Sequence, residues 1–472
     1  MKLFFLLGLL LVHAIQWPFS PAYAEDTPAL PRGLESGKSS PSQAPELPSG
    51  LGDRVINSTD SSNDVFESRE RTFEVSGFWE ARAGTRTQND SNERQTSLLE
   101  TRMQLRVERP GDTVSMKLAG DLIYDEIADT HEVNLEKGEG FLDLREANLL
   151  FRPARFIDLK AGRQILTWGT GDLIFINDLF PKDFKSFFIG RDEEYLKAPS
   201  DAVKMSLFSG IANLNVAYTP RFDANRFIDG NRISFFNPAT GTITGKDDPL
   251  KTNVPDGWFD DDELAARLYT NVSGYELAAY GYTGFWKGPA GFDPKTNNAT
   301  FPKLDVLGLS ARGTLGPGIG NIEFGYYHSG DDSNGSDPLI RNSELRLLAG
   351  YEQEVARETT LGVQYYLEQM QDHGKYKDKL PAGSPELDKN RHVVTVRLTR
   401  LAMQQDLLLS MFNFYSPSDQ DGYLRLLASY RLDDHWTGSG GLNLFYGDDS
   451  HTFFGQLEDN SNVYLSIRYG FG

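Results

Sequence analysis

The charged residues with the most regular spacing in this sequence stand at alternate positions of short segments. In the segment 97–108, Glu100, Arg102 and Arg106 alternate with apolar residues such as Leu105. Side chains two residues apart point to the same face of a β-strand, so such a segment has one charged and one apolar face. Carboxylates and guanidinium groups on one wall hold water and set an electric field across a passage. The spacing therefore indicates binding and passage of polar solutes.

The same alternation recurs along the chain and defines a set of candidate pore-lining residues. Together they predict a polar interior of mixed sign that is slightly basic, whether the charges guide a solute or only hydrate and brace the wall. The candidates are Arg82, Glu100, Arg102, Arg106, Lys117, Asp121, Glu146, Lys160, Arg346, Arg397, Arg425 and Arg468.

A second group of candidates lies in one long connection, 167–200. This connection is rich in aromatic residues, and such side chains are too apolar for a freely solvated loop. We therefore predict that it folds into the interior as a constriction or plug; the alternative is an external lid packed on neighbouring loops. The candidate constriction residues are Trp168, Asp172, Asp178, Asp183, Arg191, Asp192 and Glu193.

Signals for other chemistry are weak. The sequence has 7 histidines and no cysteine, and no histidine belongs to a recognisable nucleophile motif or to an HExxH metal motif. The acidic segment 331–337 partly resembles a calcium loop but lacks the spaced glutamate, and a solvated turn is the favoured interpretation. A net charge of −20 argues against nucleic acid. We predict no enzyme activity, no catalytic residues, no cofactor and no metal.

The elements that position the charged residues are about 18 amphipathic strands over 72–472, each near the roughly ten residues that a tilted membrane strand requires. Every second connection is tight, as at 109–112 and 273–274, and most of the others are long, as at 221–262. Outer-membrane barrels show this asymmetry, with short periplasmic turns and long extracellular loops. The predicted fold class is all-β, an antiparallel up-and-down transmembrane barrel. A soluble sandwich or propeller is the alternative, but neither sorts its loops in this way.

The residues before the strands predict two further regions. Residues 1–24 carry a positive charge, a short apolar run and an Ala-x-Ala pattern, which is typical of a signal peptide and too short and interrupted for a membrane-spanning helix. Residues 25–71 are rich in Pro, Ser, Gly and Asp, which predicts a disordered periplasmic tail. These features favour the outer membrane of a Gram-negative bacterium.

The segment 161–184 carries a distinctive series of residues: Gly162-Arg163-Gln164, Trp168-Gly169, Asp178 and Pro181-x-Asp183. The series resembles a signature of poorly characterised, porin-like Gram-negative outer-membrane barrels, some of which accompany RND-type exporters and which look like relatives of the alginate-export porins. The resemblance covers about residues 140–225. It departs from the pattern at Phe180, where asparagine is more usual before Pro181. It implies a porin-like or exporter-associated role.

The resulting functional hypothesis is an outer-membrane channel for a hydrophilic solute, with anionic and long-chain solutes among the options. One alternative is a plugged export component that works with an inner-membrane pump. Another is a surface-interaction barrel with a closed pore. The expected partners are outer-membrane lipid and lipopolysaccharide, the barrel assembly machinery and, by resemblance, an inner-membrane exporter. We expect a monomer or a trimer.

Overall fold

The computed structural model describes residues 73–128 and 130–472. The predicted signal peptide and tail, over 1–24 and 25–71, lie outside these residues. Eighteen strands form one sheet. They are β1 Glu74–Arg86, β2 Thr96–Arg109, β3 Val114–Asp125, β4 Leu142–Ala154, β5 Ile157–Ile165, β6 Pro199–Leu207, β7 Asn213–Thr219, β11 Glu263–Val272, β12 Tyr275–Phe285, β15 Lys303–Leu315, β16 Gly318–Ser329, β17 Glu344–Ala356, β18 Thr359–Met370, β19 Asn390–Ala402, β20 Leu407–Ser416, β21 Asp421–Arg431, β22 Trp436–Gly447 and β23 Asn462–Phe471.

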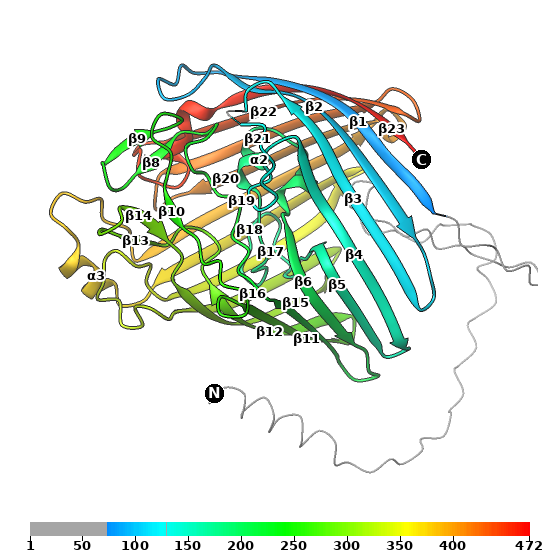
Figure 1. The fold of residues 1–472 in the computed structure, drawn as a ribbon, viewed down its shortest axis with the longest axis horizontal. Coiled ribbons are helices and arrows are strands. Elements are labelled where there is room, and N and C mark those ends of the chain that lie inside the picture. Colours follow the sequence, from blue (N-terminus) through cyan, green and yellow to red (C-terminus); the bar gives the residue numbers. More distant parts are fainter. Residues whose placement is uncertain (1–72, 129) are drawn as a thin grey trace, which may run out of the picture. The chain divides into compact units, whose positions relative to one another are not determined.

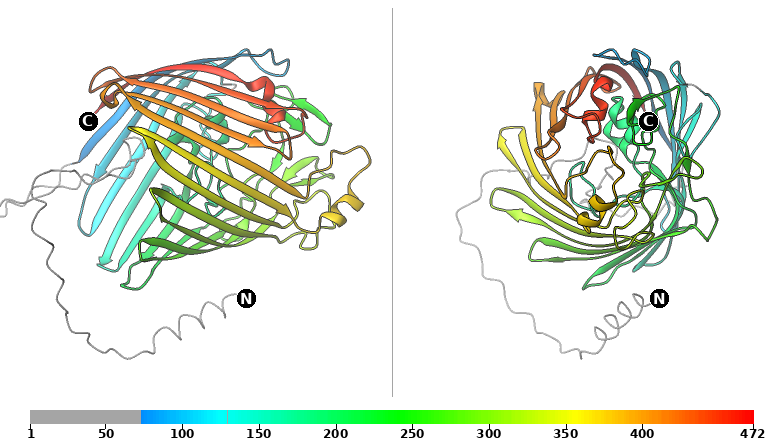
Figure 2. Two further views of the ribbon diagram at one scale, coloured as in Figure 1. Left: turned by 180° about the vertical axis from the view of Figure 1, so that it is seen from behind. Right: turned by 90° about the vertical axis from the view of Figure 1, so that its left-hand side faces the viewer.

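The sheet closes on itself. Each strand pairs antiparallel with the next barrel strand along the chain, and β1 also pairs with β23, with Trp79 opposite Tyr469. Figure 1 shows the tilted strands with β1 beside β23, and the right-hand view of Figure 2 looks into the ring they form. The predicted 18-stranded up-and-down barrel is confirmed.

The two faces of each strand differ as the alternation predicts. On β2, Leu99, Met103 and Leu105 are exposed on the outside, whereas Glu100 and Arg102 are buried inside. An apolar outer surface would be costly in water and is the surface that lipid covers. The wall therefore has an apolar exterior and a polar interior.

The connections are sorted by length between the two ends of the barrel. One end, here called the short-turn end, carries tight turns such as 273–274 between β11 and β12. Ser273 and Gly274 there have φ values of 51° and 83°, the left-handed pair that a tight hairpin turn uses. The other end, the loop end, carries the long connections, with 417–420 as a short exception. The predicted asymmetry of turns and loops is confirmed.

Several loops have secondary structure that alternation did not predict. Two small sheets and a helix lie among the long connections at the loop end. They are β8 Phe235–Asn237 with β9 Thr242–Thr244; β10 Thr252–Asn253 with β13 Gly291–Asp293 and β14 Asn298–Thr300; and α3 His373–Lys379. No helix within residues 73–128 and 130–472 has the length and apolar composition needed to cross a bilayer.

Candidate functional site

The connection between β5 and β6, residues 166–198 and here called the lumenal loop, runs through the barrel interior. It contains the helix α2 Phe184–Phe188 and the 3-10 turn η1 Glu193–Leu196. Figures 1 and 2 show α2 within the ring of strands. The Asp183 carboxylate starts α2 by accepting a hydrogen bond of 2.7 Å from the backbone N–H of Ser186. The structure thus places this connection inside the barrel, while its role as a constriction or plug stays a prediction.

Glu323 on β16 holds the first part of the lumenal loop. Its carboxylate accepts hydrogen bonds from the backbone N–H groups of Thr170 and Gly171, the latter at 2.8 Å, and from Asn177 Nδ2 at 2.9 Å. Glu323 is fully buried, and a buried carboxylate needs several donors to stay in place. This side chain thus acts as an anchor for 170–177.

The next wall contact is made by Asp172. Its backbone N–H donates to Gln364 Oε1 at 2.7 Å, and its carbonyl accepts from Gln364 Nε2 at 2.8 Å. Its carboxylate meets the Arg397 guanidinium at two points, 2.6 Å from Nε and 2.9 Å from NH2. Such two-point contacts fix orientation as well as distance. The loop is therefore tied to β18 and β19 by both backbone and side chain.

Aromatic packing holds α2 against another part of the wall. The Phe188 ring lies 5.4 Å from the Tyr423 ring and 5.2 Å from the Phe445 ring, both edge to face. All three side chains are buried. Aromatic side chains of this size dominate the energy of buried contacts. The helix is fixed on β21 and β22 by apolar contact.

Two side chains of the lumenal loop, Arg191 and Tyr195, contact residues of β2 and β3. Arg191 meets Glu100 with Nε–Oε1 and NH2–Oε2 distances of 3.0 and 2.5 Å. The Tyr195 hydroxyl donates to Asp121 at 2.8 Å, and its ring lies 4.4 Å from the Arg102 guanidinium. These groups are largely covered by the loop. Their pairing offsets the free-energy cost of removing them from water.

The run Asp192-Glu193-Glu194 contacts arginines of the strands β1, β19 and β23. Asp192 contacts Arg82 on β1 at 2.7 Å and also Arg468 on β23. Glu193 contacts Arg397 at 3.0 Å. Carboxylates of the loop therefore pair directly with guanidinium groups of the inner wall. We call Asp172, Asp192, Glu193 and Glu194 the loop carboxylates.

The loop carboxylates are not equally easy to protonate. Burial raises the pKa of Asp172 to about 6, although Arg397 acts in the opposite direction. Burial also opposes ionisation of Asp192, but Arg468 and Arg82 outweigh it and lower the pKa to about 2. The pKa of Glu194 is raised, chiefly by burial. Near neutral pH, Asp172 and Glu194 are thus easier to protonate than Asp192.

The structure places all twelve candidate pore-lining residues on inward-facing strand positions, but in different surroundings. The side chains of Glu100, Arg102 and Asp121 are at most 2% exposed, so they support the loop and do not face open water. Arg82, Arg397, Arg425 and Arg468 contact the loop itself. Arg106, Lys117, Glu146 and Lys160 lie nearer the short-turn end, where Lys117 contacts Glu146 at 2.7 Å. Arg346 lies nearer the loop end and contacts Glu344 at 2.7 Å.

The candidate constriction residues separate into two groups. Asp172, Arg191, Asp192 and Glu193 meet charged residues of the barrel wall. Trp168 packs on Phe180 and Tyr280. Asp178 contacts Lys182 at 3.0 Å, and Asp183 caps α2 and contacts Arg226 at 3.3 Å. Trp168, Asp178 and Asp183 therefore shape and pack the loop.

Sequence reasoning missed the wall residues that receive the loop. Glu323 and Gln364 make central contacts, as does Tyr195 of the loop itself, but none was singled out as an anchor. Glu323 belongs to the alternating pattern of β16, so its inward direction could be predicted from the sequence. Its contacts with the backbone N–H groups of Thr170 and Gly171 could not be predicted.

One group of carboxylates at the loop end has ligand atoms close together. Oxygen atoms of Glu136, Asp201 and Asp223 lie within 4.8 Å of one another. Glu136 contacts Arg221 and Asp201 contacts Arg163, each at 2.7 Å. The two guanidinium groups thus pair with Glu136 and Asp201. Asp223 accepts hydrogen bonds from the Ser200 hydroxyl at 2.7 Å and from the backbone N–H of Asp201 at 3.0 Å.

No protein-family model and no curated protein matches this sequence. Among solved structures, OccAB3 of Acinetobacter baumannii is 11% identical over 84% of this chain and 99% of its own, with a TM-score of 0.51. The outer membrane channel DcaP of the same species is 12% identical over 84% of this chain and 97% of its own, with a TM-score of 0.41. A mutant of Rh. blastica porin is 10% identical over 85% of this chain and 100% of its own, with a TM-score of 0.36. The likeness to OccAB3 shows a shared barrel fold.

Proposed function

We propose that this chain is a channel of the Gram-negative outer membrane through which small hydrophilic solutes pass, narrowed by the lumenal loop. The apolar outer wall and the closed ring of strands support a membrane location, because a barrel leaves no strand edge unpaired in lipid. Its lipid partners are outer-membrane lipid and lipopolysaccharide, and the barrel assembly machinery inserts it as a monomer or a trimer. It has no catalytic role.

The observation that carries the channel proposal is the exposure of charged side chains inside the barrel. The side chains of Asp172, Glu193 and Glu194 are 40%, 44% and 40% exposed although they contact the inner wall. In a dry plug, carboxylates at this depth would be covered on all sides. Water therefore reaches the point where the loop carboxylates face the arginines.

The exposed charges also favour one kind of solute. The side chains of Arg397 and Arg468 are 20% and 25% exposed, less than those of the loop carboxylates that they contact. A passing ion thus meets loop carboxylates that are more exposed than the arginines beside them. The negative charge of these carboxylates favours the passage of small cations over that of anions. An anionic or long-chain solute is the competing choice, and the sign of the ion selectivity decides between them.

Planar-bilayer recording of the refolded protein tests the proposal. The wild-type chain should give ohmic steps, and a variant with 169–192 replaced by a short glycine-serine linker should give larger ones. If only the linker variant conducts, the chain is a plugged barrel, as expected for an export component that works with an inner-membrane pump. If neither conducts, although both show the heat-modifiable gel mobility of a folded barrel, the surface-interaction hypothesis replaces the channel.

A further inference from the structure

A hollow on the outer wall lies beside the turn between β2 and β3, at the short-turn end. Its volume is about 310 Å³, at the lower end of the range for small-molecule sites. It is lined by Phe73, Arg109, Pro110, Thr113, Val114, Met116 and Leu149. We call it the Arg109 groove.

The strand register explains why one cation stands among apolar side chains. Arg109 on β2 is paired with Met116 on β3, which is paired with Leu149 on β4, so the three lie in one row across the wall. Arg109 also has the same outward direction as Met103 and Leu105, two positions that are exposed on the apolar exterior. The groove therefore belongs to the outer surface and has no connection with the lumenal loop.

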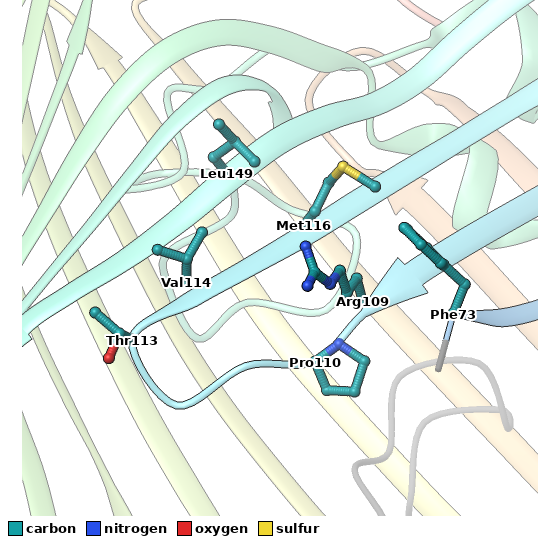
Figure 3. Close-up of a pocket in the computed structure, with 7 residues that line it drawn as sticks. All are labelled: Phe73, Arg109, Pro110, Thr113, Val114, Met116 and Leu149. Atoms are coloured by element: carbon teal, nitrogen blue, oxygen red, sulfur yellow. The ribbon is translucent and has the colours of Figure 1, made fainter. Parts of the chain in front are cut away.

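The Arg109 guanidinium lies beside an aromatic ring. Figure 3 shows its side chain between Phe73 and Val114, with the guanidinium group toward Met116, and its centre lies 5.7 Å from the centre of the Phe73 ring. None of the residues that line the groove is acidic. A guanidinium group on a lipid-facing wall is stabilised by an anion, and phosphate suits its paired N–H donors.

We propose that the Arg109 groove binds a phospholipid of the membrane leaflet next to the short turns, with the lipid phosphate paired to Arg109. Val114, Met116 and Leu149 supply the apolar surface for the adjoining acyl chain. Charge complementarity and the place of the groove on an apolar exterior select this occupant. The proposal rests on the membrane location argued above and extends it to a specific lipid site.

Native mass spectrometry of the full chain in detergent, titrated with dioleoylphosphatidylglycerol, tests the site. The wild-type protein should bind a first lipid about tenfold more tightly than Arg109→Gln, since one charge-assisted contact is lost. Arg400→Gln is the matched control, because Arg400 is exposed near another short turn and does not line the groove. It should bind like the wild type. Equal affinity of the wild type and Arg109→Gln would overturn the proposal.

Three further measurements identify what occupies the Arg109 groove. Dioleoylglycerol, which lacks the phosphate, should not compete; if it binds equally well, the role of Arg109 is refuted. Displacement of the first lipid by a tenfold excess of inorganic phosphate would make the groove a site for the free anion and overturn the lipid assignment. Tight binding seen only in a variant lacking 25–68 would assign the groove to that segment instead. Heat-modifiable mobility and vesicle insertion of every variant report separately on the membrane location.

Discussion

Arg397 on β19 binds Asp172 of the lumenal loop at two points, with Nε–Oδ2 and NH2–Oδ1 distances of 2.6 and 2.9 Å. The same guanidinium contacts Glu193 at 3.0 Å. One wall residue thus joins two loop positions that are far apart in sequence. This contact lies where the interior charges are exposed to water, so it connects the position of the loop with the proposed ion selectivity.

The first prediction concerns pH. Partial burial raises the pKa of Asp172 to about 6, so its carboxylate is charged at pH 7 and mostly neutral at pH 5. Lowering the pH removes one negative charge beside Arg397 and Glu193. The cation-to-anion permeability ratio should therefore fall by about twofold between pH 7 and pH 5, measured from reversal potentials in a salt gradient. In Asp172→Asn this step should be smaller, and a step of unchanged size would assign it to another group, such as Glu194 with its raised pKa.

The second prediction concerns Glu193 and Glu194, two adjacent exposed loop carboxylates. Glu193→Gln/Glu194→Gln removes two negative charges that face Arg397 and Arg468. The remaining guanidinium groups should change the preference from cations to anions, with a reversal potential of opposite sign. The matched control is Glu354→Gln/Glu358→Gln, which removes two charges at a short turn of the wall. A similar change in the control would show that selectivity is set at the barrel rim.

The strands could be predicted from the sequence because each has a different solvent on each face. The alternation over 97–108 gave β2 to within a residue at each end, Thr96–Arg109. Because lipid lies outside the wall and water inside it, apolar and polar side chains alternate along every strand. This pattern can be recognised within a single short segment of sequence. The sorting of the connections by length follows from the same up-and-down topology.

The partners of the lumenal loop could not be predicted, because they depend on how the ring closes. Asp192 contacts Arg82 and Arg468, which come from strands at opposite ends of the chain and adjoin only through the β1–β23 pairing. Phe188 likewise meets Tyr423 and Phe445 with no local signal in the sequence. The sequence identified which loop folds inward, from its aromatic content, but not the wall residues that receive it.

The third prediction tests Glu323 as the anchor of the first part of the loop. Glu323→Gln keeps the size of the side chain but replaces an acceptor oxygen by a donor facing the N–H groups of Thr170 and Gly171. Amide hydrogen exchange over 169–177 should become about tenfold faster, as expected for about 1.4 kcal/mol of lost local stability. Glu276→Gln, which breaks the 2.6 Å contact with Arg267 on another part of the wall, should leave this exchange unchanged. Faster exchange throughout the barrel would mean that Glu323 stabilises the whole fold.

The fourth prediction tests the outer wall by comparing two depths on one strand. Leu309 lies at the middle of β15 and Leu315 at its short-turn end, and both side chains are exposed on the outside. In a bilayer, Leu309→Arg should lower the free energy of unfolding by about 2–4 kcal/mol and Leu315→Arg by about 0–1 kcal/mol, because arginine near the rim reaches the interface. Reversible guanidinium unfolding in phosphatidylcholine vesicles measures both values. The two exposed leucines would respond alike in water, so equal losses would contradict a membrane-spanning wall, whereas a graded loss places the centre of β15 in the hydrocarbon.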